Sequence, residues 1–137
     1  HVLLDPPCSG TGVLRGGDPR SWEHLVQDYD GYIVSRARLQ MTLGEALLPA
    51  VPPGGSLIYA TCSIDPREDE AVVDHLLAHC RDFSLVDLGP WRARLGNATP
   101  GLDGFLGKNV TGEMGRCLRI DPSVETEGFF VAQLQRA

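Results

Sequence analysis

Two short apolar runs separated by a helical pattern constrain the fold of this chain more than any other feature. The first run, Val2–Leu4, ends in Asp-Pro-Pro, and the second, Leu57–Ala60, follows a Pro-Pro-Gly-Gly turn at 52–55. Between the runs, apolar or small residues recur at the spacing of a helix with one buried stripe, at Ile33, Ala37, Met41, Gly44 and Leu48. A strand, a helix and a second strand in this order predict a parallel pair with a right-handed crossover. We therefore expect an α/β protein with a layered sheet.

A second helix is predicted directly after the second apolar run. Asp65 can serve as its N-cap, Pro66 stands at the first helical position, and Glu68 occupies the capping-box position. Its core stripe consists of apolar residues at helical spacing, Val72, Val73, Leu76, Leu77 and Cys80. Cys80 is therefore predicted to be a packing residue.

The remainder of the chain is predicted to contain three more strands and one long loop. Apolar runs indicate strands at 83–88, 117–120 and 128–134. The segment from Trp91 to Gly115 is rich in glycine and lacks periodicity, which predicts a long loop.

Size and charge narrow the class of protein. The length of 137 residues is typical of one globular domain. The formal net charge of −6 argues against the basic surface that most nucleic-acid-binding proteins carry. No stretch approaches the roughly 20 apolar residues that cross a bilayer, and no signal segment opens the chain. Four cysteines without a C-x-x-C pair indicate reduced thiols rather than disulfides or a zinc site. We expect an intracellular protein without a membrane or metal partner.

Cys8 and Cys62 follow the two apolar strands, so a parallel pairing would bring both thiols to the same edge of the sheet. A single cysteine at such a place more often packs, but two thiols in Gly/Ser/Thr-rich loops favour chemistry. A thiolate adds readily to an electron-poor ring, and the N-terminus of the helix predicted at Pro66 would favour the thiolate form of Cys62. Cys62 is therefore predicted to be a nucleophile that works opposite Cys8.

Two histidines on the second predicted helix stand at a spacing that can hold a metal ion. His75 and His79 are four residues apart, but the sequence alone offers no third ligand beside them. A solvated helix face is the interpretation favoured here, and no metal is predicted.

The motif DPPCSGTG at Asp5–Gly12 and the motif ATCS at Ala60–Ser63 resemble the two signature motifs of Nop2/Sun-type (NSUN, RsmB/RsmF-like) RNA cytosine-5 methyltransferases. The resemblance implies the C-terminal half of a Rossmann-like methyltransferase fold, with parallel strands, crossover helices and an antiparallel C-terminal strand. Residues 1–137 would then be a single partial catalytic domain. The resemblance extends to Arg38-Leu39-Gln40, the turn at 52–55, and the segments at 68–73 and 128–132.

The resemblance also implies roles for three residues. The Cys62 thiolate would add to carbon 6 of cytosine in RNA, which makes carbon 5 nucleophilic toward the methyl group of S-adenosylmethionine. Cys8 would help to release the covalent adduct, and Asp5 would lie near both cofactor and base. Taken alone, Asp5 could equally be a turn-capping residue before proline. The target cytosine must be single-stranded or flipped out, because a base inside a duplex is unreachable.

Three hypotheses remain open from the sequence. The chain can be part of an RNA cytosine-5 methyltransferase of rRNA or tRNA whose cofactor-binding half precedes His1, since no glycine-rich loop with an acidic partner is present here. It can also be a non-catalytic remnant or interaction module of that family. An amino-group methyltransferase is disfavoured, because Cys8 stands where that class needs an aromatic residue to stack on the base.

Overall fold

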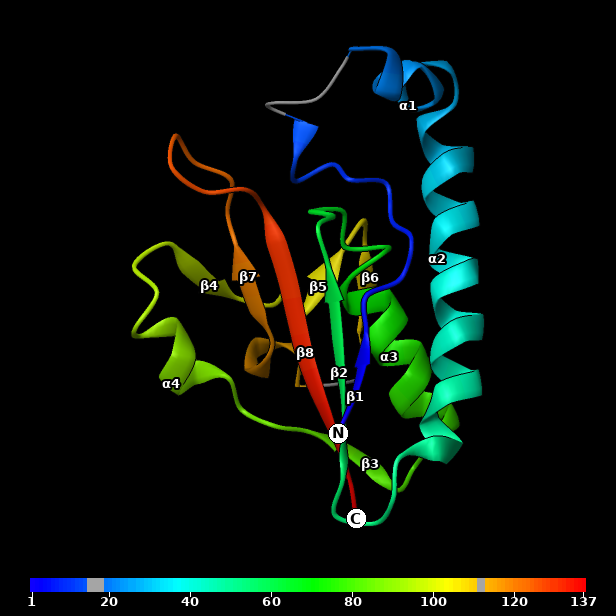
Figure 1. Cartoon of the computed structure of the whole chain (residues 1–137), viewed down its shortest axis with the longest axis vertical. Coiled ribbons are helices and arrows are strands. Elements are labelled where there is room, and N and C mark those ends of the chain that lie inside the picture. The colour runs from blue at the N-terminus through cyan, green and yellow to red at the C-terminus, as the bar shows by residue number, and fades with distance from the viewer. Residues whose placement is uncertain (15–18, 111–112) are drawn as a thin grey trace.

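A six-stranded mixed sheet organises the part of the chain that the computed structural model describes, residues 1–14, 19–110 and 113–137 (Figure 1). The strand order is β1-β2-β8-β7-β4, and β3 pairs with β8 as well. The strands of this sheet are β1 (Val2–Leu4), β2 (Ser56–Thr61), β3 (Phe83–Leu85), β4 (Ala98–Pro100), β7 (Leu118–Ile120) and β8 (Phe129–Arg136).

The predicted parallel pair is confirmed. β1 runs parallel to β2 with Leu3 opposite Ile58, and α2 (Tyr29–Leu47) lies between the two strands in the chain. β8 runs antiparallel to β2 along the whole length of β2, from Ser56 opposite Gln135 to Thr61 opposite Phe130. The α/β fold with an antiparallel C-terminal strand is therefore as expected from the sequence.

Two long helices, α2 and α3 (Glu70–His79), pack together on one face of the sheet (Figure 1). Gly44 permits this close packing, because a Cβ atom there would lie 2.7 Å from the Leu76 side chain. Short helices precede and follow α2, namely η2 (Pro19–Trp22), α1 (Glu23–Gln27) and η3 (Leu48–Ala50). Among the described residues, no helix has the length and apolarity needed to cross a membrane.

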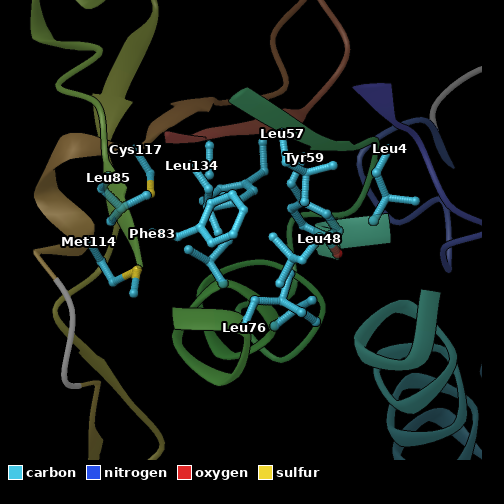
Figure 2. Packing of buried hydrophobic residues seen from close by; sticks show 14 of the residues in the cluster. Leu4, Leu48, Leu57, Tyr59, Leu76, Phe83, Leu85, Met114, Cys117 and Leu134 are labelled. Atoms are coloured by element: carbon cyan, nitrogen blue, oxygen red, sulfur yellow. The ribbon is translucent and has the colours of Figure 1, made fainter. Parts of the chain in front are cut away.

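The core lies between these helices and the sheet. Leu57 and Tyr59 of β2 point into it and are fully buried, as period-two alternation requires. Leu76 of α3 belongs to the same buried cluster as Phe83 of β3 and Leu134 of β8, and Figure 2 shows all three side chains on one side of the sheet. Each fully buried leucine contributes about 2 kcal/mol of hydrophobic stabilisation, so this layer holds the strand ends in place.

The predicted start of the second helix at Pro66 is wrong. α3 begins at Glu70, and residues 66–69 form turns. The carboxylate of Asp65 accepts hydrogen bonds from the backbone and side chain of Arg67. Glu68 points into the protein instead of capping a helix. The N-terminus of α3 therefore comes later in the chain after Cys62, at Glu70 instead of Pro66.

The segment from Trp91 to Gly115 is not the long loop that was predicted, although residues 111–112 lie outside the described residues. It takes part in five short elements, which contain two to four residues each and so show no periodicity in the sequence. One of them, β4, extends the main sheet by pairing with β7. The others are α4 (Gly89–Arg92), the antiparallel pair β5 (Gly104–Phe105) and β6 (Lys108–Asn109), and η4 (Met114–Arg116).

Candidate active site

The two predicted site cysteines meet. Cys8 lies in the loop after β1 and Cys62 directly follows β2, and their Sγ atoms are 3.2 Å apart. Both thiols are free and half-buried. The meeting follows from the topology, because parallel neighbouring strands deliver their carboxyl ends to the same edge of the sheet.

A hydrogen bond joins the two thiols and shifts their pKa values in opposite directions. The hydrogen bond from Cys62 lowers the pKa of Cys8 to about 7, although burial opposes this shift. The same hydrogen bond, together with burial and the Cys8 charge, raises the pKa of Cys62. Near neutral pH one negative charge is therefore available to the pair, and a proton can pass between the sulfur atoms.

A glycine holds the two thiol loops against each other. The Gly12 N–H donates to the carbonyl oxygen of Cys62 at 2.9 Å, and the Gly128 N–H donates to the Gly12 carbonyl at 2.8 Å. A Cβ atom at Gly12 would lie 2.5 Å from the Gly128 oxygen and 2.6 Å from the Cys62 oxygen. Only glycine allows this approach of the backbones.

A buried carboxylate, Glu68, joins the residues that follow the two cysteines. One of its oxygens accepts from the Ser9 N–H and from Gln40 Nε2, each at 2.9 Å. The other oxygen accepts from the hydroxyl groups of Ser9 and Ser63. A buried carboxylate is tolerated only with such donors, so the four bonds fix both loops on one group.

Tyr59 and Thr61 support this arrangement from β2. The Tyr59 hydroxyl donates to the backbone carbonyl of Glu68 and lies 3.2 Å from Gln40 Oε1. The Thr61 hydroxyl donates to Asp69 at 2.6 Å. Sequence reasoning missed this network, since Glu68 has the spacing of a capping residue and Gln40 entered only through the resemblance.

Arg119 of β7 anchors the segment that follows Cys62. Its guanidinium forms two bonds to Glu70, at 2.7 and 2.8 Å, and donates to the Ile64 carbonyl at 2.6 Å. Asp69 lies 3.4 Å from the same guanidinium, and burial raises the pKa of this carboxyl well above its usual range. The sequence holds one sign of this buried ion pair, because Arg119 stands between two apolar residues, Leu118 and Ile120.

Comparison with known proteins connects this geometry to a family. A family model described as 16S rRNA methyltransferase RsmB/F matches residues 1–135. The chain belongs to this family. Its relatives include ribosomal RNA small subunit methyltransferase B of Salmonella arizonae, which is 39% identical over 77% of this chain and 24% of the relative. The tRNA (cytosine(49)-C(5))-methyltransferase of Pyrococcus abyssi is 33% identical over 99% of this chain and 41% of the relative.

Solved structures show the same fold. A methyltransferase homolog protein from Pyrococcus horikoshii superposes with a TM-score of 0.72 at 31% identity, over 98% of this chain and 38% of that chain. NSun6 from Pyrococcus horikoshii with SFG superposes with a TM-score of 0.66 at 27% identity, over 98% and 29% of the two chains. The chain thus spans less than half the length of each of these four relatives.

Asp5 lies at the same edge of the sheet as the thiols. It is exposed at the carboxyl end of β1, and its charge also raises the pKa of Cys62, after the larger effects of the Cys8 hydrogen bond and burial. β1 is the last strand in the sheet order of the described residues. Asp5 therefore lies close enough to the thiol pair for its charge to act on Cys62, and its role beside a methyl donor stays a prediction.

Proposed function

We propose that the protein carrying this chain methylates carbon 5 of cytosine in rRNA or tRNA through a covalent adduct on Cys62. The observation that carries the proposal is the pair of half-buried sulfur atoms 3.2 Å apart at the ends of two parallel strands. The name of the Pyrococcus abyssi relative supports carbon 5 of cytosine as the target, and the family description supports RNA.

In the first step, the Cys62 proton passes to the Cys8 thiolate and the Cys62 sulfur adds to carbon 6. The electron pair of the ring double bond then becomes available at carbon 5. S-adenosylmethionine supplies the methyl group when bound, and the presence of its analogue SFG in the NSun6 structure supports this donor. Asp5 would accept a hydrogen bond from the cytosine amino group or, if protonated, donate to the ring nitrogen.

Release of the product needs a base near the adduct. Cys8 gives its first proton to solvent, and the thiolate takes the proton of carbon 5. The double bond re-forms as the bond between carbon 6 and the Cys62 sulfur breaks. One proton leaves per methyl transferred, and the return of a proton from Cys8 to Cys62 restores the starting state of the pair. The reaction needs reduced thiols, so we also propose an intracellular location.

A trapping experiment tests the nucleophile. The intact protein is incubated with S-adenosylmethionine and RNA containing 5-fluorocytosine, whose carbon 5 has no proton to lose, and adducts are resolved on a denaturing gel. We expect a covalent complex that Cys62→Ala abolishes, while Cys80→Ala, a half-buried thiol outside the pair, retains it. A complex that survives Cys62→Ala would refute the assignment, and no complex from the unmodified protein would favour the non-catalytic alternative.

Unmodified cytosine tests the release step. In Cys8→Ala, the hydrogen bond and the charge that raise the pKa of Cys62 are gone, so Cys62 can lose its proton to solvent and add to carbon 6. The proton at carbon 5 of the adduct then lacks a base, so we expect covalent RNA complexes to accumulate. An adduct level equal to that of the unmodified protein would remove the proposed role of Cys8.

A further inference from the structure

A second cluster of reactive side chains lies on the helical layer, in the C-terminal halves of α2 and α3. Glu45 of α2 faces His75 and His79 of α3, and one ligand atom from each residue lies within 4.8 Å of the others. His75 Nε2 is 2.7 Å and His79 Nε2 is 3.9 Å from the same Glu45 oxygen. The sequence offered no third ligand because Glu45 is thirty residues from His75 and on another helix.

The hydrogen bond of the His79 ring decides which of its nitrogen atoms carries a lone pair. Its Nδ1 lies 2.9 Å from the backbone carbonyl oxygen of His75, and a carbonyl can only accept, so Nδ1 carries the proton. A neutral His79 then holds its lone pair on Nε2, the atom that faces Glu45. In metal sites, a histidine that binds the ion through one ring nitrogen usually donates a hydrogen bond from the other, often to a backbone carbonyl.

The facing atoms can hold a cation, which would replace the proton that bridges His75 Nε2 and Glu45 at 2.7 Å. A lone pair on His79 Nε2 and a carboxylate oxygen on Glu45 repel each other unless a positive charge lies between them. Tetrahedral zinc with bonds of about 2.0–2.2 Å holds its ligand atoms roughly 3.4 Å apart. The two distances to Glu45, 2.7 and 3.9 Å, lie on either side of this value, so small side-chain rotations suffice.

We propose that Glu45, His75 and His79 form a binding site for a divalent transition-metal ion, with zinc as the best match. Two imidazoles and one carboxylate are ligands that suit this class of ion. All three side chains are exposed to solvent in part, by 29% for His75, 55% for His79 and 42% for Glu45, so the ion can enter and keep a water ligand. The ion would join α2 to α3 beside the close contact of Gly44 with Leu76.

Calorimetric titration of the chelator-treated intact protein with zinc chloride tests this site. The paired thiols also attract zinc, so we place the test in a Cys8→Ser/Cys62→Ser background, where we expect the site to persist. His75→Asn and His79→Asn should each weaken this binding by at least about tenfold. His1→Asn, which changes a histidine outside the cluster, should leave it unchanged.

Cobalt(II) identifies the ligands independently of affinity. In the same background we expect a visible absorption spectrum of nitrogen and oxygen ligands, without thiolate charge-transfer bands, that His79→Asn removes. Zinc should also raise the midpoint of thermal unfolding, and Glu45→Gln should abolish this gain while leaving the metal-free midpoint unchanged. Absence of binding in the thiol-free background, or binding that both histidine substitutions leave intact, would overturn the proposal.

Discussion

Removing the Glu68 carboxylate should loosen both thiol loops at once. The side chain is fully buried and accepts four hydrogen bonds, from two serine hydroxyls, one backbone N–H and one amide N–H. In Glu68→Ala the Ser9 and Ser63 hydroxyls, already 3.4 Å apart, can turn toward each other. The Ser9 N–H and one Gln40 N–H have no such alternative acceptor in this network.

The magnitude follows from these two N–H groups. Each unpaired buried donor costs about 1–3 kcal/mol, and Ser9 is at the lower end because it is half-buried and accessible to water. We therefore expect Glu68→Ala to lower the free energy of unfolding by about 2–4 kcal/mol. Glu68→Gln keeps an oxygen for the two N–H donors and should cost about 1 kcal/mol, which is the lost charge assistance.

Urea denaturation of the intact protein measures these differences, and the trapping gel measures the rate of adduct formation in the same variants. Adduct formation in Glu68→Gln should be about tenfold slower, because small displacements of reacting groups are costly. Glu125→Ala removes an exposed carboxylate and should change the free energy of unfolding by less than about 0.5 kcal/mol. A cost below about 1 kcal/mol for Glu68→Ala, with unchanged adduct formation, would show that other contacts position the loops.

Two further perturbations probe the thiol pair. Alkylation by iodoacetamide should be slow below neutral pH and rise with pH through a midpoint near 7, since the pKa of Cys8 is lowered to about 7 by its hydrogen bond from Cys62. Mass spectrometry of the labelled peptides follows this rate, and in Cys62→Ala a Cys8 midpoint still near 7 would exclude the partner thiol as the cause. Gly12→Ala should reduce trapping with 5-fluorocytosine RNA, because its Cβ would press on two carbonyl oxygens at 2.5 and 2.6 Å. Gly115→Ala, where a Cβ meets nothing within 4 Å, is the matched control, and equal trapping by the two variants would contradict the proposed close approach.

The sequence by itself determined the parallel strand pair and the meeting of Cys8 with Cys62. These features are local, since an apolar run, a turn and a helical stripe specify the elements, and parallel neighbours must end at the same edge. The resemblance of Asp5–Gly12 and Ala60–Ser63 to known motifs led to the family that the comparisons show. The roles of Cys8, Cys62 and Asp5 stay predictions.

Tertiary structure alone decided what surrounds the thiols. Glu68 has the spacing of a capping residue, yet it faces inward because Ser9, Gln40 and Ser63 offer donors from three different segments. Partners this far apart in the chain leave no periodic trace, and the same is true of Glu45 beside His75. A local pattern shows which element forms, whereas the contacts between elements determine which side chains meet.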